Sequence, residues 1–305
     1  MIEARGLSKR YGDKLAVNDL SFTVRPGRVT GFLGPNGAGK TTTMRLILGL
    51  DRPTAGSVTV NGRPFAELYS AMREVGALLD AKAVHGGRSA YKHLLCLAQT
   101  NGIPRSRVDE VIGIVGLEDV AGKRSGGFSL GMSQRLGIAA ALLGDPDVLM
   151  FDEPVNGLDP EGIRWIRLLM RSLAAEGRTV FVSSHLMSEM ENTADHLIVI
   201  GRGELITDCP MAEFIGGATA QAVVVTTPDG RMLTDAVAAA GGTVERDETG
   251  ELTVRGLSAE RVGELALAHG ILLHYLAPAT VSLEEAFMEL TADSIEYHAK
   301  TEARS

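Results

Sequence analysis

The stretch Gly34-Pro35-Asn36-Gly37-Ala38-Gly39-Lys40-Thr41-Thr42 decides how the rest of this sequence is interpreted. It follows an apolar run, Val29 to Leu33, typical of a buried strand, and it leads into a run with helical spacing. Its glycines let the backbone turn sharply and direct N–H groups towards one point, which with a helix N-terminus makes a phosphate site. Lys40 would place a positive charge on the β- and γ-phosphates, and Thr41 a hydroxyl on Mg²⁺. This context disfavours a turn that binds nothing, so the stretch predicts binding of a nucleoside triphosphate.

A second signal is the run Val148-Leu149-Met150-Phe151-Asp152-Glu153, in which four apolar residues are followed by two carboxylates. In a parallel α/β sheet, ligands sit at the carboxyl end of the strands. Asp152 would then hold Mg²⁺, while Glu153 would orient and polarise an attacking water. A solvated acidic turn is the alternative, and the phosphate loop upstream makes it the weaker one.

His185 stands at the same predicted edge of the sheet, directly after the strand pattern Arg178 to Ser183. A single histidine is more often structural than catalytic. Its position in line with the two carboxylates nevertheless favours a contact with the γ-phosphate. Tyr11, in a turn between two N-terminal strands, is a candidate to stack on the base of a nucleotide, a contact that an aromatic ring makes with any base. The alternative is an exposed tyrosine of the turn, and its position alone does not decide between the two.

A helical insert, about residues 88–143, interrupts the strand pattern, and its last helix begins at Ser129. Ser129 and Gly131 leave backbone N–H groups at a positive helix end, which is a second anion-binding device. Asp159 fits the N-cap of a further helix that begins with Pro160. Trp165, on that helix, is expected in the core.

Length and composition narrow the class of protein. At 305 residues the chain predicts two domains, 1–216 and 217–305. The formal net charge of -8, with no basic cluster, argues against nucleic acid as a partner. We expect no signal peptide, and the apolar stretches are too short to span a bilayer, so a cytoplasmic protein is predicted whose membrane role would need a partner.

The C-terminal part shows the pattern β-α-β-β-α-β, which predicts a small α+β sandwich. We expect a final amphipathic helix at Ser282–Leu290. The other predicted elements are strands at Ala222–Thr227, Gly242–Glu245, Glu251–Val254 and Ile271–Leu276, and helices at Leu233–Ala240 and Ala259–His269.

Together, these segments resemble the ATP-binding subunit of an ABC transporter over roughly Met1 to Gly216, and the tail resembles the accessory domain of drug- and antibiotic-export subunits. The resemblance implies an α/β fold of the P-loop NTPase type, with an antiparallel β subdomain, a helical insert and a small α+β C-terminal domain. It also implies that Tyr11 stacks on adenine, that Asp152 and Glu153 form the Mg²⁺/base pair, and that His185 is the switch histidine.

Two segments depart from the family pattern. The signature Leu-Ser-Gly-Gly-Gln maps to Phe128-Ser129-Leu130-Gly131-Met132, which differs at three of five positions but keeps Ser129 and Gly131. Asp80 stands where most relatives have Gln, and as a shorter group that only accepts hydrogen bonds it would still contact Mg²⁺ or its water.

The resemblance further implies two cassettes that close on two ATP molecules, with the phosphate loop of one facing Ser129 of the other and Asp159 crossing between them. Such a homodimer, or paired cassette, would drive an integral membrane permease encoded separately, with the protein peripheral on the inner face of the cell membrane. A soluble ABC-type ATPase of nucleic-acid maintenance, translation or cofactor assembly is the alternative, but it would need a long coiled-coil insert, a basic face or two cassettes in one chain. A P-loop kinase would leave Ser129, Asp159 and His185 unexplained.

Overall fold

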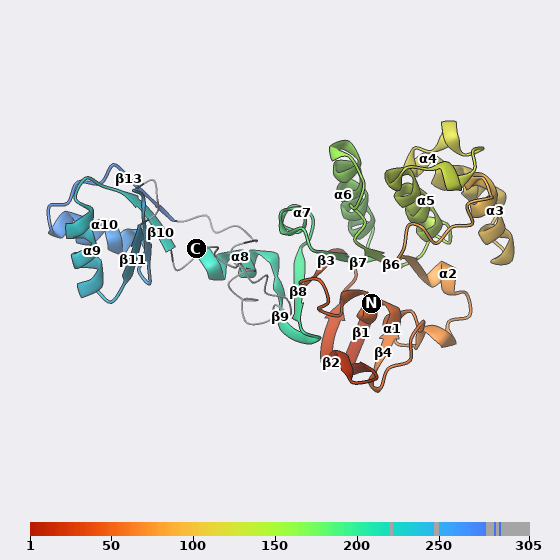
Figure 1. Ribbon diagram of the computed structural model, residues 1–305, viewed down its shortest axis with the longest axis horizontal. Coiled ribbons are helices and arrows are strands. Elements are labelled where there is room, and N and C mark those ends of the chain that lie inside the picture. The colour runs from red at the N-terminus through yellow and green to blue at the C-terminus, as the bar shows by residue number, and fades with distance from the viewer. Residues whose placement is uncertain (220–221, 247–249, 279–283, 285–286, 288–305) are drawn as a thin grey trace, which may run out of the picture. The chain divides into compact units, whose positions relative to one another are not determined.

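The structure, a computed structural model, describes residues 1–219, 222–246 and 250–278 and positions 284 and 287. The chain divides into compact units, the first containing Met1–Cys209 and the second Pro210–Leu290 (Figure 1). The boundary expected at residue 216 falls inside helix α8 (Met211–Thr219). Each unit is described by itself below.

A six-stranded sheet forms the centre of the first unit. Its spatial order is β5-β6-β7-β3-β8-β9, and the five strands β5, β6, β7, β3 and β8 run parallel to one another. Parallel strands covered on both faces read as continuous apolar runs, which explains why β6 is buried at every position. The strands are β3 (Arg28–Leu33), β5 (Val75–Leu78), β6 (Val148–Asp152), β7 (Thr179–Ser184), β8 (His196–Gly201) and β9 (Glu204–Pro210).

An antiparallel sheet of β2 (Lys14–Val24), β1 (Ile2–Tyr11) and β4 (Ala55–Val60) packs with helix α1 (Lys40–Ile47) on the central sheet. Phe22 of β2 lies 5.8 Å from the ring of Phe32 in β3, which lies 5.0 Å from Phe181 in β7. Burial of each such side chain contributes about 1.5–3 kcal/mol. Met44, Leu46 and Ile47 of α1 belong to the same core cluster, which holds this helix on the central sheet with its first residue near the carboxyl end of β3, where a ligand site is expected.

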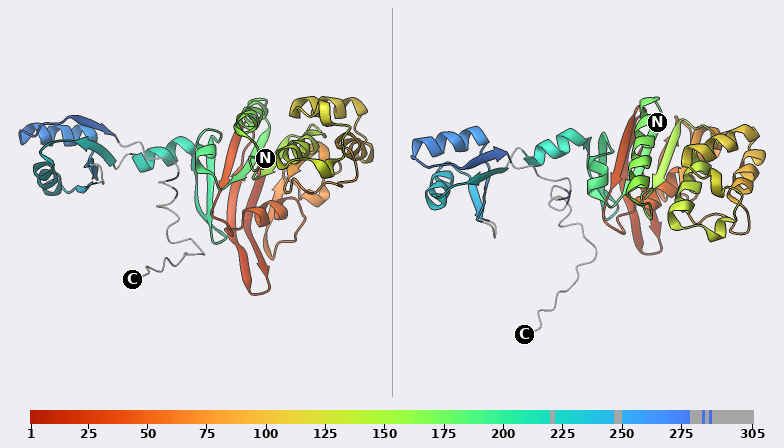
Figure 2. Two further views of the ribbon diagram at one scale, coloured as in Figure 1. Left: turned by 45° about the horizontal axis from the view of Figure 1, so that its top comes forward. Right: turned by 90° about the horizontal axis from the view of Figure 1, so that it is seen from above.

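The helical insert gathers beside the β5 edge of the central sheet, as the two further views confirm (Figure 2). It consists of α3 (Ala90–Thr100), α4 (Arg105–Val115) and α5 (Leu130–Leu142), which all lie within the predicted insert, and α5 begins directly after Ser129 as expected. The remaining helices of this unit are α6 (Pro160–Ala175), the short α2 (Ala71–Glu74) and α7 (Met187–Glu191), and the 3-10 turns η1 (Phe65–Glu67), η2 (Glu118–Val120) and η3 (Ser125–Gly127).

The prediction for Trp165 is wrong, because its side chain is only partly buried. The guanidinium carbon of Arg135, on α5, lies 4.6 Å from the centre of its ring. Trp165 therefore serves the contact between the insert and α6, as an aromatic partner of a cation, rather than the sheet core.

The second unit confirms the predicted order of elements. Its sheet has the order β11-β12-β10-β13 with antiparallel pairs throughout, and α9 and α10 contribute to its core. Its elements are β10 (Ala222–Thr226), α9 (Gly230–Ala239), β11 (Thr243–Arg246), β12 (Leu252–Arg255), α10 (Ala259–Ala268) and β13 (Tyr275–Pro278).

The last strand of this unit begins later than the predicted Ile271–Leu276. Gly270 adopts φ +67°, and the N–H of Ile271 donates to the carbonyl of Ala266 at 2.8 Å. These residues finish helix α10 before the chain reaches β13, so apolar composition was mistaken for a strand. Of the predicted helix Ser282–Leu290, only positions 284 and 287 are among the described residues.

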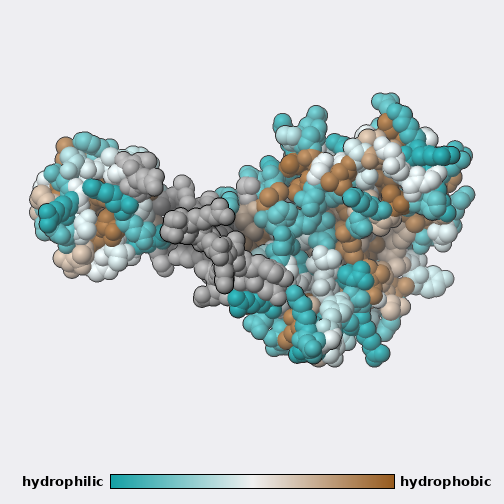
Figure 3. Space-filling view, viewed as in Figure 1, coloured by the Kyte–Doolittle hydropathy of each residue, from teal (hydrophilic) through white to brown (hydrophobic). Residues whose placement is uncertain are grey.

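Figure 3 shows hydrophobic surface on the first unit as separate patches among hydrophilic side chains. Within the part of the chain that the structure describes, no helix combines the length and the apolar character needed to cross a bilayer.

Candidate functional site

The phosphate loop joins β3 to α1 with a backbone that requires glycine. Gly37 and Gly39 have φ of +85° and +104°. A Cβ on Gly39 would lie 2.5 Å from the carbonyl oxygen of Ala16, so a side chain is excluded there. Because Gly39 is the N-cap of α1, the first free N–H groups of that helix point into the loop.

Lys40 lies inside this loop, and its side chain is almost fully buried. Its Nζ donates to the carbonyl oxygens of Gly34 at 2.6 Å and Pro35 at 3.4 Å, and it lies 3.9 Å from Oε1 of Glu153. Burial lowers the pKa of Lys40, and the nearby carboxylates of Glu153 and Asp152 oppose that shift. A desolvated ammonium held by carbonyl groups is well placed to bind an anion entering the loop.

Asp152, at the end of β6, is linked to both neighbouring elements. Its Oδ2 accepts from the hydroxyl of Thr41 at 2.7 Å, and its Oδ1 accepts from the hydroxyl of Ser183. A hydroxyl and a carboxylate are oxygen ligands that suit Mg²⁺ shared with phosphates. Among the described residues no group of three or more His, Cys, Asp or Glu side chains could hold a metal. Thr41 and Asp152 together offer a hydroxyl and a carboxylate oxygen, which fit an ion that takes its other oxygen ligands from phosphates and water.

Glu153 has the backbone conformation φ +53°, which non-glycine residues rarely adopt and which concentrates at functional sites. Its N–H donates to the carbonyl and hydroxyl oxygens of Ser183, at 3.2 and 3.1 Å, and its own carbonyl accepts from the amide of Gln134 at 3.0 Å. Its Oε2 lies 2.7 Å from Nδ1 of His185. Sequence reasoning did not assign Ser183 or Gln134 to the site. Two features could have indicated them: Ser183 precedes His185 by two residues, and Gln134 lies in the helix that begins after Ser129.

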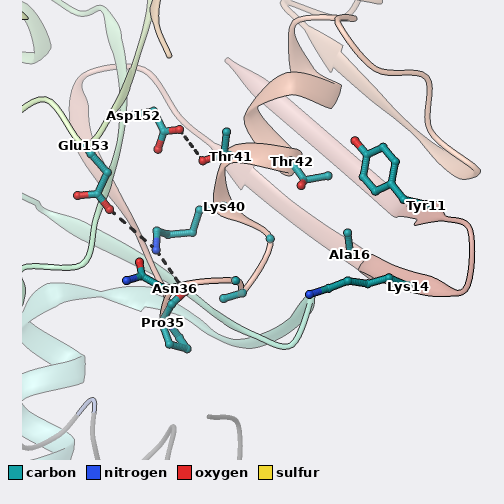
Figure 4. Close-up of a pocket in the computed structure, with 13 residues that line it drawn as sticks. Tyr11, Lys14, Ala16, Pro35, Asn36, Lys40, Thr41, Thr42, Asp152 and Glu153 are labelled. Carbon is teal, nitrogen blue, oxygen red and sulfur yellow. Dashed lines mark hydrogen bonds and ion pairs between the residues drawn. The ribbon is translucent and has the colours of Figure 1, made fainter. Parts of the chain in front are cut away.

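A pocket of about 400 Å³ connects these groups (Figure 4). In Figure 4, Glu153 and Asp152 lie on one side of Lys40 and Tyr11 lies on the other. The volume lies within the range of ligand pockets. Its lining consists of the predicted loop residues 35–42, with Asp152, Glu153, Tyr11 and two residues that sequence reasoning missed, Lys14 and Ala16.

Ser129, Gly131 and Asp159 do not line this pocket, and its described lining includes no residue of the segments around them. Ser129 accepts from the N–H of Met132 at 3.2 Å, and Asp159 from that of Gly162 at 2.8 Å, so both are the predicted N-caps. A Cβ on Gly131 would lie 2.8 Å from the carbonyl oxygen of Gly157. The second helix start therefore packs on the loop before Asp159, and it does not line the pocket at its own chain's phosphate loop.

Asp80 lines a neighbouring pocket of about 370 Å³ that Asp152 and Glu153 also line. Its Oδ1 accepts from the N–H of Lys82 at 2.8 Å. It also borders a cleft of about 530 Å³ with mostly apolar lining from the end of α1, β5, α3 and α5. The position that differs from the family pattern thus lies between the carboxylates and this cleft.

Comparison with known proteins identifies two segments. The family described as "ABC transporter" matches residues 17–156, and a domain of unknown function matches residues 221–284. The bacitracin transport ATP-binding protein BcrA of Bacillus licheniformis is 44% identical over 213 residues, 69% of this chain and 70% of that protein. The lantibiotic transport ATP-binding protein SrtF of Streptococcus pyogenes is 36% identical, over 68% of this chain and 90% of that protein. The Nod factor export ATP-binding protein I of Burkholderia orbicola is 41% identical, over 68% and 70%.

Solved structures agree. The ATP-binding subunit of an ABC transporter superposes with a TM-score of 0.66 at 25% identity, covering 72% of this chain and 93% of that one. The dimeric structure of MJ0796, a bacterial ABC transporter cassette, gives a TM-score of 0.64 at 24% identity and covers 69% and 99%. The predicted fold class is confirmed.

Proposed function

This chain belongs to the ABC transporter family of ATP-binding proteins, and on that premise we propose that it serves an exporter of antibiotics or related compounds. It is an ATPase that drives a separate membrane permease. The export direction and the class of cargo are supported by the relatives named for bacitracin and lantibiotic transport and for Nod factor export.

The observation that carries the mechanism is the placement of Glu153 between Lys40 and His185, beside the phosphate loop. In our proposal the triphosphate of ATP lies in the loop, where Lys40 turns from carbonyl oxygens to phosphate oxygens. Thr41 and Asp152 would hold Mg²⁺, which would supply positive charge to the phosphates. Glu153 orients the attacking water and takes its proton, and His185 fixes the Glu153 carboxylate from its other side.

The site also needs a second copy. Ser129 and Gly131 start a helix whose free N–H groups suit the γ-phosphate, yet they do not line the pocket at their own phosphate loop. We infer that two cassettes pair so that each loop faces the other chain's Ser129. Because ATP would bind the closed pair better than the open one, its binding drives closure.

The cleft of about 530 Å³ beside Asp80 is our proposed contact for the permease. Its apolar lining comes from both the core and the helical insert. A permease segment bound in this cleft would therefore be displaced when the core and the insert move relative to one another. The protein would then work at the inner face of the cell membrane, held there by its permease.

The test combines nucleotide binding with partner stimulation. Lys40→Ala should abolish equilibrium binding of a fluorescent ATP analogue, because the loop loses its buried ammonium. Lys92→Ala, which removes an exposed lysine of α3, is the matched control and should bind normally. We expect a multi-span membrane protein to be encoded beside this chain, and that protein, reconstituted with it, should stimulate hydrolysis. Unchanged binding by Lys40→Ala would reject the site, and absence of stimulation would reject the exporter assignment.

A further inference from the structure

The loop that follows α1 holds the end of strand β1. The N–H of Thr54 donates to the carbonyl of Ser8 at 2.8 Å, and the N–H of Arg10 donates to the hydroxyl of Thr54 at 3.0 Å. The residues that lead into this contact, Asp51 and Arg52, are therefore fixed beside Tyr11, the last residue of β1.

Asp51 connects Tyr11 to the helix of the phosphate loop. Its Oδ2 accepts from the hydroxyl of Tyr11 at 2.8 Å and from Nε of Arg45 at 2.7 Å, while its Oδ1 accepts from Nη2 of Arg45 at 3.4 Å. Arg45 lies in the last turn of α1. The hydrogen bonds from Arg45 and Tyr11 lower the pKa of Asp51, so its carboxylate stays an acceptor for both.

One face of the Tyr11 ring is already covered. Nζ of Lys9 lies 4.8 Å from the ring centre and donates to the carbonyl of Arg52 at 2.7 Å. Lys9 and Tyr11 are two residues apart on one strand and share its face. Tyr11 lines the phosphate-loop pocket and Lys9 does not, so the ring face that meets the pocket is the one away from Lys9.

Tyr11 without these contacts would be a half-exposed side chain at a turn, free to change rotamer. Its exposed fraction is 45%. The hydroxyl bond to Asp51 holds the far end of the ring, and the ammonium of Lys9 holds one face. A ring fixed in this way loses less conformational entropy when a planar base stacks on it.

We propose that Asp51, held by Arg45, is a positioning residue that orients the Tyr11 ring for the base of the nucleotide. The proposal rests on the proposed function, because it assumes that the triphosphate occupies the loop at Lys40. Asp51 contacts no ligand itself, so its influence on ATP must pass through the ring.

The experiment is a mutant cycle on the full chain. The probes are a non-hydrolysable ATP analogue with Mg²⁺ and, as a ligand without a base, magnesium tripolyphosphate. Tyr11→Ala should raise the Kd for the ATP analogue about 5- to 150-fold, the measured range for one aromatic–base stack. Asp51→Ala and Tyr11→Phe should each raise it about two- to tenfold, the effect of one net hydrogen bond. Tripolyphosphate should bind all variants as it binds wild type.

The decisive variant is Asp51→Ala in the Tyr11→Ala background, which should bind the ATP analogue no more weakly than Tyr11→Ala alone. In steady-state hydrolysis, Asp51→Ala should raise KM for ATP and leave kcat unchanged. Glu74→Ala is the matched control, because the Arg63–Glu74 pair is as exposed (50% and 21%) as Arg45–Asp51 (43% and 19%) and should leave ATP binding unaltered.

The results that would contradict the positioning role differ from the result that would contradict the proposed function. A folded Asp51→Ala with wild-type affinity, or one that weakens binding further when Tyr11 is already Ala, would overturn the positioning role. If Asp51→Ala is unstable in thermal denaturation, Tyr11→Phe breaks the same bond and leaves the Arg45–Asp51 pair in place, so wild-type affinity there also overturns it. If wild type binds neither probe, the proposed function is what has failed.

Discussion

Replacing Glu153 with Gln tests the proposed hydrolysis in the most direct way. The amide has the size of the carboxylate and keeps the backbone bonds to Ser183, so the positive φ at this position stays supported. It cannot take a proton from water. Loss of a positioned general base costs about 10²–10⁴ in rate, so kcat for ATP hydrolysis should fall by that factor.

Binding of Mg-ATP, unlike hydrolysis, should not be weakened by Glu153→Gln. Oε1 of Glu153 lies 3.9 Å from the Lys40 ammonium, and two charges at that separation near a protein surface attract by about 4 kcal/mol. Partial exposure of Glu153 reduces this figure. The nearby carboxylate raises the pKa of Lys40, so its removal lets burial lower that pKa further in the nucleotide-free protein. The phosphates then meet less negative charge, and the affinity for Mg-ATP should equal or exceed that of wild type.

The assays are steady-state phosphate release, equilibrium binding and size-exclusion chromatography with Mg-ATP. Because ATP persists in Glu153→Gln, a dimer should accumulate that the nucleotide-free protein lacks. Adding Ser129→Arg should abolish that dimer, since a bulky side chain would occupy the place of the γ-phosphate. Glu67→Gln, an exposed carboxylate in η1, is the control and should behave as wild type. Hydrolysis by Glu153→Gln at the wild-type rate would refute the role of the carboxylate, and an inactive variant that never dimerises would refute the two-chain site.

Two further predictions concern Asp80 and the second unit. Asp80→Gln loses the acceptor for the N–H of Lys82 but keeps a polar group beside Asp152, so ATP hydrolysis should stay within about tenfold of wild type. A much larger drop in steady-state rate would mean that the carboxylate is matched to its neighbours. Removal of residues 222–305 should change the Kd for Mg-ATP by no more than about twofold, because every proposed contact within the chain lies before them. A folded truncation that binds ATP much more weakly in calorimetry would assign the second unit a role in the site.

The elements that position the site could be predicted because their signals are local. The loop at Gly34–Thr42, the apolar run that became β6 and the Ser129 cap of the insert each depend on a few neighbouring residues. Helix α7 carried no comparable signal, and residues 271–274 looked like a strand because apolar composition does not distinguish a helix end from an extended segment.

The contacts between distant segments could not be predicted. Nothing in the sequence near Tyr11 indicates that Asp51 accepts its hydroxyl, and nothing near Glu153 indicates that Gln134 of α5 holds its carbonyl. Both depend on how elements forty or twenty residues apart meet in three dimensions. Tyr11, Ser129 and Asp159 were singled out on local grounds, and their proposed roles await the experiments above.

Helix α1 connects the phosphate loop to the residues that hold Tyr11. Its first residue, Lys40, lies in the phosphate loop, and its last turn carries Arg45, which holds the carboxylate bound to the Tyr11 hydroxyl. The eight residues of this helix span about 12 Å at 1.5 Å per residue. One inserted residue would turn everything beyond it by about 100° and carry Arg45 away from Asp51. In the proposed placement of ATP, the number of residues in α1 therefore sets the spacing between the phosphate site at Lys40 and the base site at Tyr11.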